Sequence, residues 1–181
     1  MVKIWQAKIG HVTLYLLDTD LPENTMQDRD ISHQLYGGDK TMRVEQEIIL
    51  GVGGARALRE MGMKPTIWHI NEGHAAFMML ERMRDLVRQG LDFASALEAV
   101  AANTVFTTHT AVPAGHDYFS DEMMFRYFEG FRRDLGITHE DFMALGRVSG
   151  SQGFKITALA FPGAPPPHGA RKMNGGVPTP T

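Results

Sequence analysis

The first part of the chain alternates apolar and polar residues in the manner of β-strands. The stretch VKIWQAKIGHVTLYLLD holds two β-prone runs that are split at Gly10 and His11. Glycine takes the positive φ that a tight turn needs, so this pattern predicts a β-hairpin whose second strand, Val12–Leu17, is buried. The polar segment that follows, up to about Lys40, is long for a plain connection inside a domain. Its length indicates either a functional loop or an insertion without a role.

Helical spacing of apolar residues begins after this segment. The stretch Thr41–Met61 carries Val44, Ile48, Ile49, Val52 and Leu58 at that spacing. Gly51, Gly53 and Gly54 interrupt it, and each costs a helix about 1 kcal/mol relative to Ala, so we expect them to allow close packing against another element. They do not form a phosphate loop, because GVGGAR lacks the Lys-Ser/Thr pair of that motif and follows no strand.

Short strands and helices alternate through the rest of the chain. The pattern predicts strands at Thr66–Ile70 and Thr104–Thr108, and helices at Ala75–Arg88, Asp92–Ala102, Asp121–Leu135 and Thr138–Leu145. Strands separated by helices favour a parallel sheet with helical crossovers, so the predicted fold class is α/β with Rossmann-like layers. In such sheets, ligands bind at the carboxyl ends of the strands.

Composition narrows the possible partners. The chain of 181 residues is 43% hydrophobic, enough to bury a core, and its 18 basic residues nearly balance its 21 acidic residues. No charge excess favours nucleic acid or an anionic membrane, and no apolar stretch approaches the roughly 20 residues of a membrane span. The absence of cysteine excludes disulfides and thiolate chemistry. We expect a cytoplasmic protein with a small or neutral ligand.

Polar side chains gather where the predicted strand at Thr66–Ile70 ends. In WHINEGH, Asn71, Glu72 and His74 follow this strand and open a helix. They could bind a ligand oxygen at the helix start. Alternatively, Asn71 could cap the helix while the negative charge of Glu72 interacts favourably with the helix dipole. The pattern leaves both possibilities open. The two histidines lie on different elements and lack the HExxH spacing, so no metal site is expected. Trp68 could offer a flat face to a ligand or pack in the core, and core packing is favoured.

The next predicted strand ends in the same way. FTTHTAVPAGHDYF places His109 after the strand, where we expect it beside His74. One histidine in such a position is more often structural than functional, whereas two on adjacent strand ends leave a functional and a structural role equally open. LYGGDK reads on its own as a Gly-Gly turn that ends in an N-cap aspartate, Asp39.

Four motifs carry a resemblance to a known family. In this order and at this spacing, LYLLDTDLPEN, QLYGGDKTMRVEQE, HINEGHAAF and FTTHTAVPAGHDYF resemble the α-glucan (glycogen/maltodextrin) phosphorylases, from about Lys3 to Ala160. The resemblance implies a partial Rossmann-like domain of the glycosyltransferase-B type over residues 1–160, with a parallel sheet, helical crossovers and an N-terminal β-hairpin. The Pro- and Gly-rich tail, residues 161–181, falls outside it and is expected to be disordered.

The resemblance implies roles for individual residues. LYGGDK looks like the family's mobile gate loop, which puts Asp39 near the sugar and Arg43 in the same region. INEGH is similar to the family's Leu-Asn-Asp-Thr-His, so Glu72 stands where other members have Asp, and His74 keeps the histidine. THTAVP is similar to Asn-His-Thr-Val-Leu-Pro, which implies that His109 contacts the glucose 6-hydroxyl. The candidate catalytic residues are Glu72 and Asp39, and the candidate substrate-binding residues are Asn71, His74, His109, Arg43 and Asp117.

The resemblance also implies what this chain lacks. Family members are several times longer and hold the lysine for pyridoxal phosphate in a second Rossmann-like domain, which no stretch here resembles. We therefore expect no cofactor in this chain, and a catalytically incomplete domain that binds glucose, maltodextrin or another glycoside. Because the resemblance ends after GFKITALA, a truncated or frame-shifted reading frame is the expected cause.

Two alternatives stay open. The chain could be a small glycoside hydrolase that uses water, with Glu72 and a second carboxylate among Asp18, Asp20, Asp39 and Asp117. It could instead be an inert or self-associating remnant, because part of a two-domain protein exposes apolar surface. In that case we expect a homo-oligomer formed through this surface.

Overall fold

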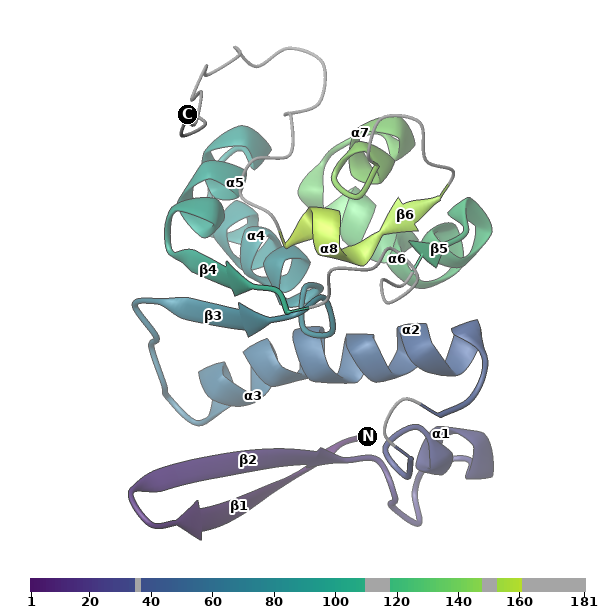
Figure 1. Cartoon of the computed structure of the whole chain (residues 1–181). Coiled ribbons are helices and arrows are strands. Elements are labelled where there is room, and N and C mark those ends of the chain that lie inside the picture. Colours follow the sequence, from purple (N-terminus) through teal and green to yellow (C-terminus); the bar gives the residue numbers. More distant parts are fainter. Residues whose placement is uncertain (35–36, 110–117, 148–152, 161–181) are drawn as a thin grey trace, which may run out of the picture.

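A long helical segment crosses the middle of the molecule, between an N-terminal hairpin and an α/β body (Figure 1). The structure is a computed structural model that describes residues 1–34, 37–109, 118–147 and 153–160. Its fold is mixed α/β, with a small parallel sheet and an antiparallel hairpin, as the sequence predicts. The tail, residues 161–181, lies outside the described residues, and the domain boundary at residue 160 stays a prediction.

The hairpin predicted at the N-terminus is present, but its second strand is not buried. β1 (Lys3–Ile9) pairs with β2 (Val12–Asp18) in antiparallel register, and Gly10 makes the turn with a φ of 60°. Residues alternate along β2 between exposed and half-buried positions, because only one face of the hairpin packs on the central helix. The alternating residues of a strand predict that its side chains form two faces, but they do not show whether other elements cover the second face.

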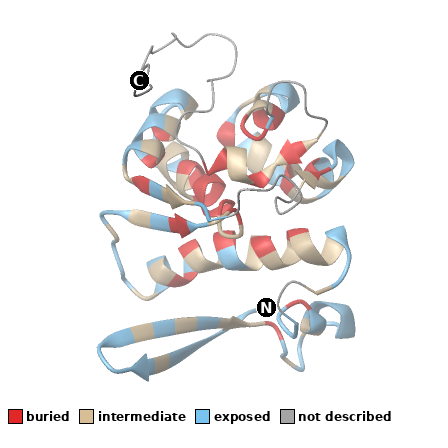
Figure 2. Ribbon diagram, viewed as in Figure 1, coloured by how far each residue is buried: buried red, intermediate tan, exposed pale blue. Residues whose placement is uncertain are grey.

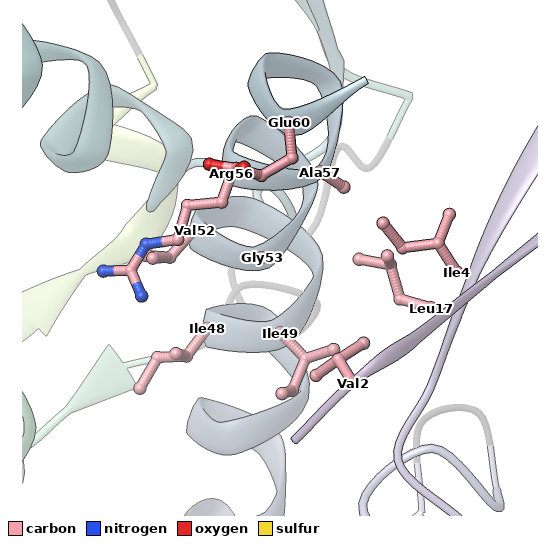
Figure 3. Close-up of a pocket in the computed structure, with 10 residues that line it drawn as sticks. All are labelled: Val2, Ile4, Leu17, Ile48, Ile49, Val52, Gly53, Arg56, Ala57 and Glu60. Carbon is pink, nitrogen blue, oxygen red and sulfur yellow. The ribbon is translucent and has the colours of Figure 1, made fainter. Parts of the chain in front are cut away.

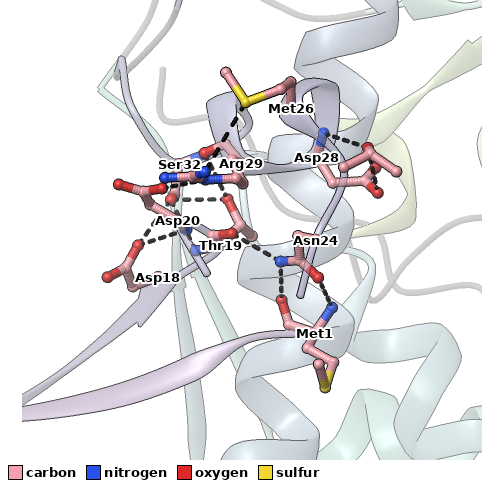
Figure 4. A network of polar contacts seen from close by, with 10 residues as sticks. Met1, Asp18, Thr19, Asp20, Asn24, Met26, Asp28, Arg29 and Ser32 are labelled. Atoms are coloured by element: carbon pink, nitrogen blue, oxygen red, sulfur yellow. Dashed lines mark hydrogen bonds and ion pairs between the residues drawn. The ribbon is translucent and has the colours of Figure 1, made fainter. Parts of the chain in front are cut away.

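The polar segment after β2 is folded around a buried threonine (Figure 4). Thr19 exchanges two hydrogen bonds with Ser32, from each backbone N–H to the other hydroxyl, at 2.9 and 3.1 Å. The Asn24 side chain donates to the Thr19 carbonyl at 2.7 Å, and Arg29 pairs with Asp20. The short helix α1 (Met26–Asp30) lies within this segment. The part of this connection from Thr19 to Ser32 is therefore held in place by its own side-chain hydrogen bonds.

The central helical segment is continuous over the predicted range. α2 (Lys40–Ile48), a turn of π-helix, η1 (Ile49–Gly53), and α3 (Gly54–Glu60) follow one another without a break. A Cβ on Gly51 would lie 2.8 Å from the Met78 backbone nitrogen, so the predicted close packing is confirmed there. A Cβ on Gly54 would meet nothing within 4 Å, and for that glycine the prediction is wrong.

Two parallel strands form the sheet of the α/β body. β3 (Trp68–Asn71) pairs with β4 (Thr104–Thr107), with Asn71 opposite Thr107 at their carboxyl ends. The connection between them holds α4 (Met78–Arg88) and α5 (Phe93–Ala102), so the predicted helical crossover is confirmed. Asp92 caps α5 as expected, accepting from the Ser95 N–H at 2.9 Å. α4 begins three residues later than predicted, after the turns that follow β3.

The remaining elements complete the core beside the sheet, to the right of β3 and β4 and above α2 in Figures 1 and 2. They are β5 (Tyr118–Phe119), α6 (Asp121–Leu135), α7 (His139–Ala144), β6 (Phe154–Lys155) and α8 (Ile156–Leu159). Phe77 lies at the centre of an aromatic cluster, with its ring centroid 4.4 Å from that of Phe128 and 6.1 Å from that of Phe119. Buried residues concentrate in this body, whereas the hairpin is mostly exposed (Figure 2). Within the described ranges, no helix combines the length and the apolar character that crossing a membrane requires.

Candidate functional site at the carboxyl ends of the parallel strands

The two parallel strands bring Asn71 and His109 together at one edge of the sheet. The Glu72 N–H donates to the Thr107 carbonyl at 2.8 Å, which extends the strand pairing by one residue. His109 Nε2 then lies 3.1 Å from the Asn71 amide oxygen, and both side chains are exposed. Because that oxygen only accepts, Nε2 donates and Nδ1 of the neutral ring is left as an acceptor. The sheet therefore presents an amide and an imidazole side by side.

Glu72 fixes the chain that follows each strand. Its carboxylate accepts from the Thr108 hydroxyl at 3.1 Å and from the His109 backbone N–H at 2.5 Å. Its φ is 60°, and among the described residues it alone has a positive φ without being glycine. Such a conformation costs a non-glycine residue about 1 kcal/mol or more, and residues of this kind concentrate at functional sites. Gly73 follows, where a Cβ would lie 2.8 Å from Ile156 Cγ2 of α8.

A second polar group lies between α2 and the turn after β3. Glu47 is 2% exposed, and its Oε1 lies 3.5 Å from His74 Nδ1 and 3.7 Å from Arg43 Nη2. Sequence reasoning named Arg43 and His74 and missed Glu47. A signal was available, because Glu47 stands three residues after Val44 on the buried side of the predicted helix. The structure ties His74 to α2 and ties His109 to Asn71 and Glu72.

The remaining predicted residues have local roles or lie outside the description. Asp39 is the N-cap of α2, as its sequence predicts, and its Oδ1 accepts from the Met42 N–H at 2.9 Å. Asp117 falls within 110–117, outside the described residues, and so does the start of LYGGDK at 35–36. In the second half of α2, Glu45 Oε1 accepts a hydrogen bond from the Tyr127 hydroxyl at 2.6 Å. Burial and this carboxylate raise the pKa of Tyr127 to about 12.

Trp68 packs toward the core, as favoured from the sequence. It is half-buried against the hydrophobic core, and the guanidinium of Arg82 lies 4.6 Å from its ring centroid. Arg82 also donates to the Thr104 hydroxyl at 2.7 Å, and burial lowers its pKa to about 10. The indole is thus covered by a cation of the crossover helix α4.

A cavity of about 290 Å³ lies elsewhere, between the hairpin and the central helix (Figure 3). Its lining is mostly apolar and includes Ile4 and Leu17 of the hairpin and Ile49 and Val52 of η1. None of the strand-end residues lines it. An apolar gap of this kind offers few hydrogen-bonding groups, whereas the strand ends gather several, so we take the strand ends as the candidate site.

Sequence comparison identifies relatives that match nearly the whole chain. A glycogen phosphorylase of Mycobacterium tuberculosis is 42% identical over 187 aligned positions, which cover 97% of this chain and 22% of that protein. A maltodextrin phosphorylase of Thermococcus litoralis is 42% identical over 163 positions, 88% of this chain and 19% of that protein. A glycogen phosphorylase of Aquifex aeolicus is 33% identical over 160 positions, which cover 87% of this chain and 23% of that protein. No family model matches the chain.

The chain belongs to the glycogen and maltodextrin phosphorylase family. The resemblance drawn from the four motifs is therefore confirmed. The chain spans about a fifth of the length of the curated phosphorylases that it matches. What those proteins do as whole molecules does not pass to this chain without further argument.

The described residues do not fit a pyridoxal phosphate site of the kind that the phosphorylase resemblance implies. A Schiff-base lysine needs a position inside a cofactor pocket. The lysines within the described ranges are exposed, except Lys155, which is half-buried with its Nζ 5.6 Å from the Tyr118 ring centroid. Across the same ranges, no three or more His, Asp or Glu side chains gather as a metal site would require.

Proposed function

We propose that this chain provides part of an α-glucan-binding site in a phosphorylase-like, carbohydrate-active protein. The observation that carries the proposal is the meeting of Asn71 and His109 at the carboxyl ends of two parallel strands, 3.1 Å apart. Ligands of parallel α/β sheets bind at that edge. Homology to glycogen and maltodextrin phosphorylases supports glucose or a maltodextrin as the ligand.

The geometry suits the recognition of sugar hydroxyls. A hydroxyl donates one hydrogen bond and accepts others, so its site needs donors and acceptors held in fixed positions. Asn71 provides an amide, and His109 provides the acceptor Nδ1 once its Nε2 donates to Asn71. Arg43 and His74 add a cation and a second imidazole near α2. We propose that these side chains form one wall of a glucan cleft, to which Asp117 also contributes.

We further propose that the small sheet is part of a Rossmann-like domain of the glycosyltransferase-B type. Two features support this larger fold. The strands are parallel, and a helical crossover joins them. The candidate ligand residues also follow the carboxyl ends of the strands, as in doubly wound sheets.

We propose that Glu72 positions the loop after β4 rather than transferring a proton. Each oxygen of its carboxylate accepts a hydrogen bond from the protein, one from Thr108 and one from His109. A glycosidase needs one carboxyl as the acid and a second on the other side of the sugar bond. Asp39, the second predicted catalytic residue, is engaged as a helix cap. No observation favours the hydrolase alternative.

We propose that this chain carries no pyridoxal phosphate of its own, because the lysines in its described part lie near the surface. In phosphorylases, as the family resemblance implies, the cofactor phosphate takes part in attack by inorganic phosphate on the glucan. We therefore expect no glucose 1-phosphate from the chain alone with maltodextrin and phosphate, even after incubation with the cofactor. Glucose 1-phosphate release together with a pyridoxal absorbance band would overturn this expectation. A cytoplasmic location stays a prediction from the sequence.

Sugar binding is tested by nuclear magnetic resonance titration of the labelled chain with a maltooligosaccharide, and with a cello-oligosaccharide as the β-linked comparison. We expect the His109 and Asn71 resonances to shift with the α-linked sugar. His109→Ala should weaken binding about tenfold, since it removes a hydrogen-bonding partner held in place. His11→Ala, at the exposed hairpin turn, is the matched control and should bind as the wild type does. A chain that responds to neither sugar would refute the proposal.

A further inference from the structure

Glu47 is a buried acid inside the central helical segment. It lies on α2, is 2% exposed, and shares the buried side of that helix with Val44. Burying a carboxylate is costly unless cations and hydrogen-bond donors surround it. Its Oε1 lies 3.7 Å from Arg43 Nη2 and 3.5 Å from His74 Nδ1. A carboxylate held beside an arginine in this way is an acceptor only.

The contact between Glu47 and His74 joins two elements of the site. His74 lies in the turns between β3 and α4, under which α2 passes (Figure 1), and its side chain is 27% exposed. One side of the imidazole meets the carboxylate, so Nδ1 carries the proton and Nε2 of the neutral ring is an acceptor. At 3.5 Å the contact is long for a hydrogen bond.

We propose that Glu47 is a positioning residue that fixes the orientation and the tautomer of His74, so that Nε2 can accept a hydrogen bond from a ligand hydroxyl. Carboxylate–imidazole pairs orient ligating histidines in metal sites and serine hydrolases by the same physics. The Arg43 guanidinium, 3.7 Å from Oε1, places a positive charge beside the carboxylate. The identity of the hydroxyl as one from a glucan rests on the proposed function, whereas the tautomer of His74 does not.

The tautomer can be measured directly in this chain. Nitrogen-15 spectra of the imidazoles at alkaline pH, where the rings are neutral, distinguish a protonated from an unprotonated ring nitrogen. We expect Nδ1 of His74 to resonate as the protonated nitrogen in the wild type. If Nε2 is the protonated nitrogen, the proposal is wrong. This test uses only the wild-type chain, so it does not depend on whether a variant folds.

Two substitutions separate positioning from packing. Glu47→Met removes the acceptor at similar volume, and the order of the two nitrogen shifts of His74 should reverse. Glu47→Gln keeps an oxygen that can accept from Nδ1 and should restore the wild-type order. Glu45→Gln, two residues earlier and bonded to Tyr127, is the control that should leave His74 unchanged. An unchanged order in a folded Glu47→Met variant would refute the role of Glu47.

A titration with the maltooligosaccharide then tests sugar binding and the positioning role of Glu47 separately. Glu47→Met should bind about five- to tenfold more weakly than the wild type, and Glu47→Gln should recover most of the affinity. If the wild type binds no sugar, the proposed function fails while the tautomer still decides the role of Glu47. If sugar binds equally to the wild type and to a folded Glu47→Met variant, the positioning role fails and the proposed function stands.

Discussion

At the scale of single residues, Glu72 combines an unfavourable backbone conformation with stabilising side-chain hydrogen bonds. Its left-handed backbone, with a φ of 60°, disfavours any residue other than glycine or asparagine and aspartate. Its carboxylate meanwhile joins the ends of both strands by accepting from Thr108 and His109. The carboxylate bonds offset the strain, so each effect should be measurable once the other is removed.

A pair of substitutions at position 72 tests this balance. Glu72→Ala removes the carboxylate and keeps the strain, whereas Glu72→Gly removes both. Both variants should be less stable than the wild type, and the glycine variant should be more stable than the alanine variant by about 1 kcal/mol. Urea unfolding of the three proteins gives the two differences. At an ordinary position alanine is the more stable residue, so alanine being better here would show that residue 72 is not left-handed in solution.

Tyr127 provides a prediction about pH. Burial, followed by its hydrogen bond to Glu45, raises the pKa of Tyr127 from 10.0 to about 12. A raised folded-state pKa stabilises the fold below the unfolded-state pKa, and this contribution is lost as pH rises from about 10 through about 12. Glu45→Gln should lower the pKa of Tyr127, because it removes the negative charge beside the hydroxyl. Carbon-13 titration of the labelled tyrosines measures the pKa of Tyr127 in both proteins. An unchanged pKa would show that the Tyr127 hydroxyl does not contact Glu45 in solution.

The sequence predicts the candidate site at this scale only in part. His109 could be placed at the same edge of the sheet as the residues that follow the neighbouring strand, because parallel strands end at the same edge. The sequence named His74 as its neighbour, however, and did not predict the contact with Asn71. Glu47 could not be placed beside His74, since the two residues are far apart in the chain and no local pattern links them. The positive φ of Glu72 is also set by tertiary contacts, because the close approach of α8 to Gly73 fixes the turn.

At the scale of elements, the glycines of the central helix have different surroundings within four residues. Gly51 faces the backbone at the start of α4, where a Cβ would lie 2.8 Å from the Met78 nitrogen and 3.0 Å from the Ala75 carbonyl oxygen. Backbone cannot move aside as a flexible side chain can. Gly54 has helical dihedral angles, with a φ of −60°, and a Cβ there would meet nothing within 4 Å.

Alanine substitutions at these two glycines should therefore have opposite signs. Gly51→Ala should destabilise the protein by about 1–3 kcal/mol, because the added methyl separates η1 from α4. Gly54→Ala should stabilise it by up to about 1 kcal/mol, because alanine loses less backbone entropy in a helix. Thermal unfolding of both variants is the measurement. Equal effects of the same sign would mean that the central helix does not pack on α4 at Gly51.

Helix positions could be predicted from the sequence better than burial. Capping residues mark the helix starts, and Asp92 and Thr138 each accept from the backbone N–H of the third residue of the following helix, as their patterns indicate. Strand burial depends on which neighbour covers each face. For β2 the alternating pattern is compatible with one covered face or two, and the structure has one.

At the scale of the whole molecule, the hairpin leaves one apolar face open. Cross-strand partners share a face, so Trp5 and Leu16, and Ile9 and Val12, lie together with Leu14 on the side away from the central helix. These five side chains are 40–61% exposed. Charged residues of that face lie only at its end, where Lys3 stacks on Trp5 and Asp18 accepts from the Trp5 indole. A surface that covers this face must be apolar and uncharged, and a second copy of the chain has such a surface.

The self-association predicted from the sequence should therefore proceed through the outer hairpin face. Sedimentation velocity of the wild-type chain should show a mass that rises with protein concentration, because burial of apolar surface is the driving force. Leu16→Lys, on a residue 52% exposed, should return the chain to a monomer, since it places a charge in the contact. Leu50→Lys is the matched control, because Leu50 is 50% exposed on η1 and lies outside this face. A wild type that stays monomeric, or a Leu50→Lys variant that dissociates equally, would refute the hairpin as the contact. If the Leu16→Lys variant still associates, the contact lies on another apolar surface.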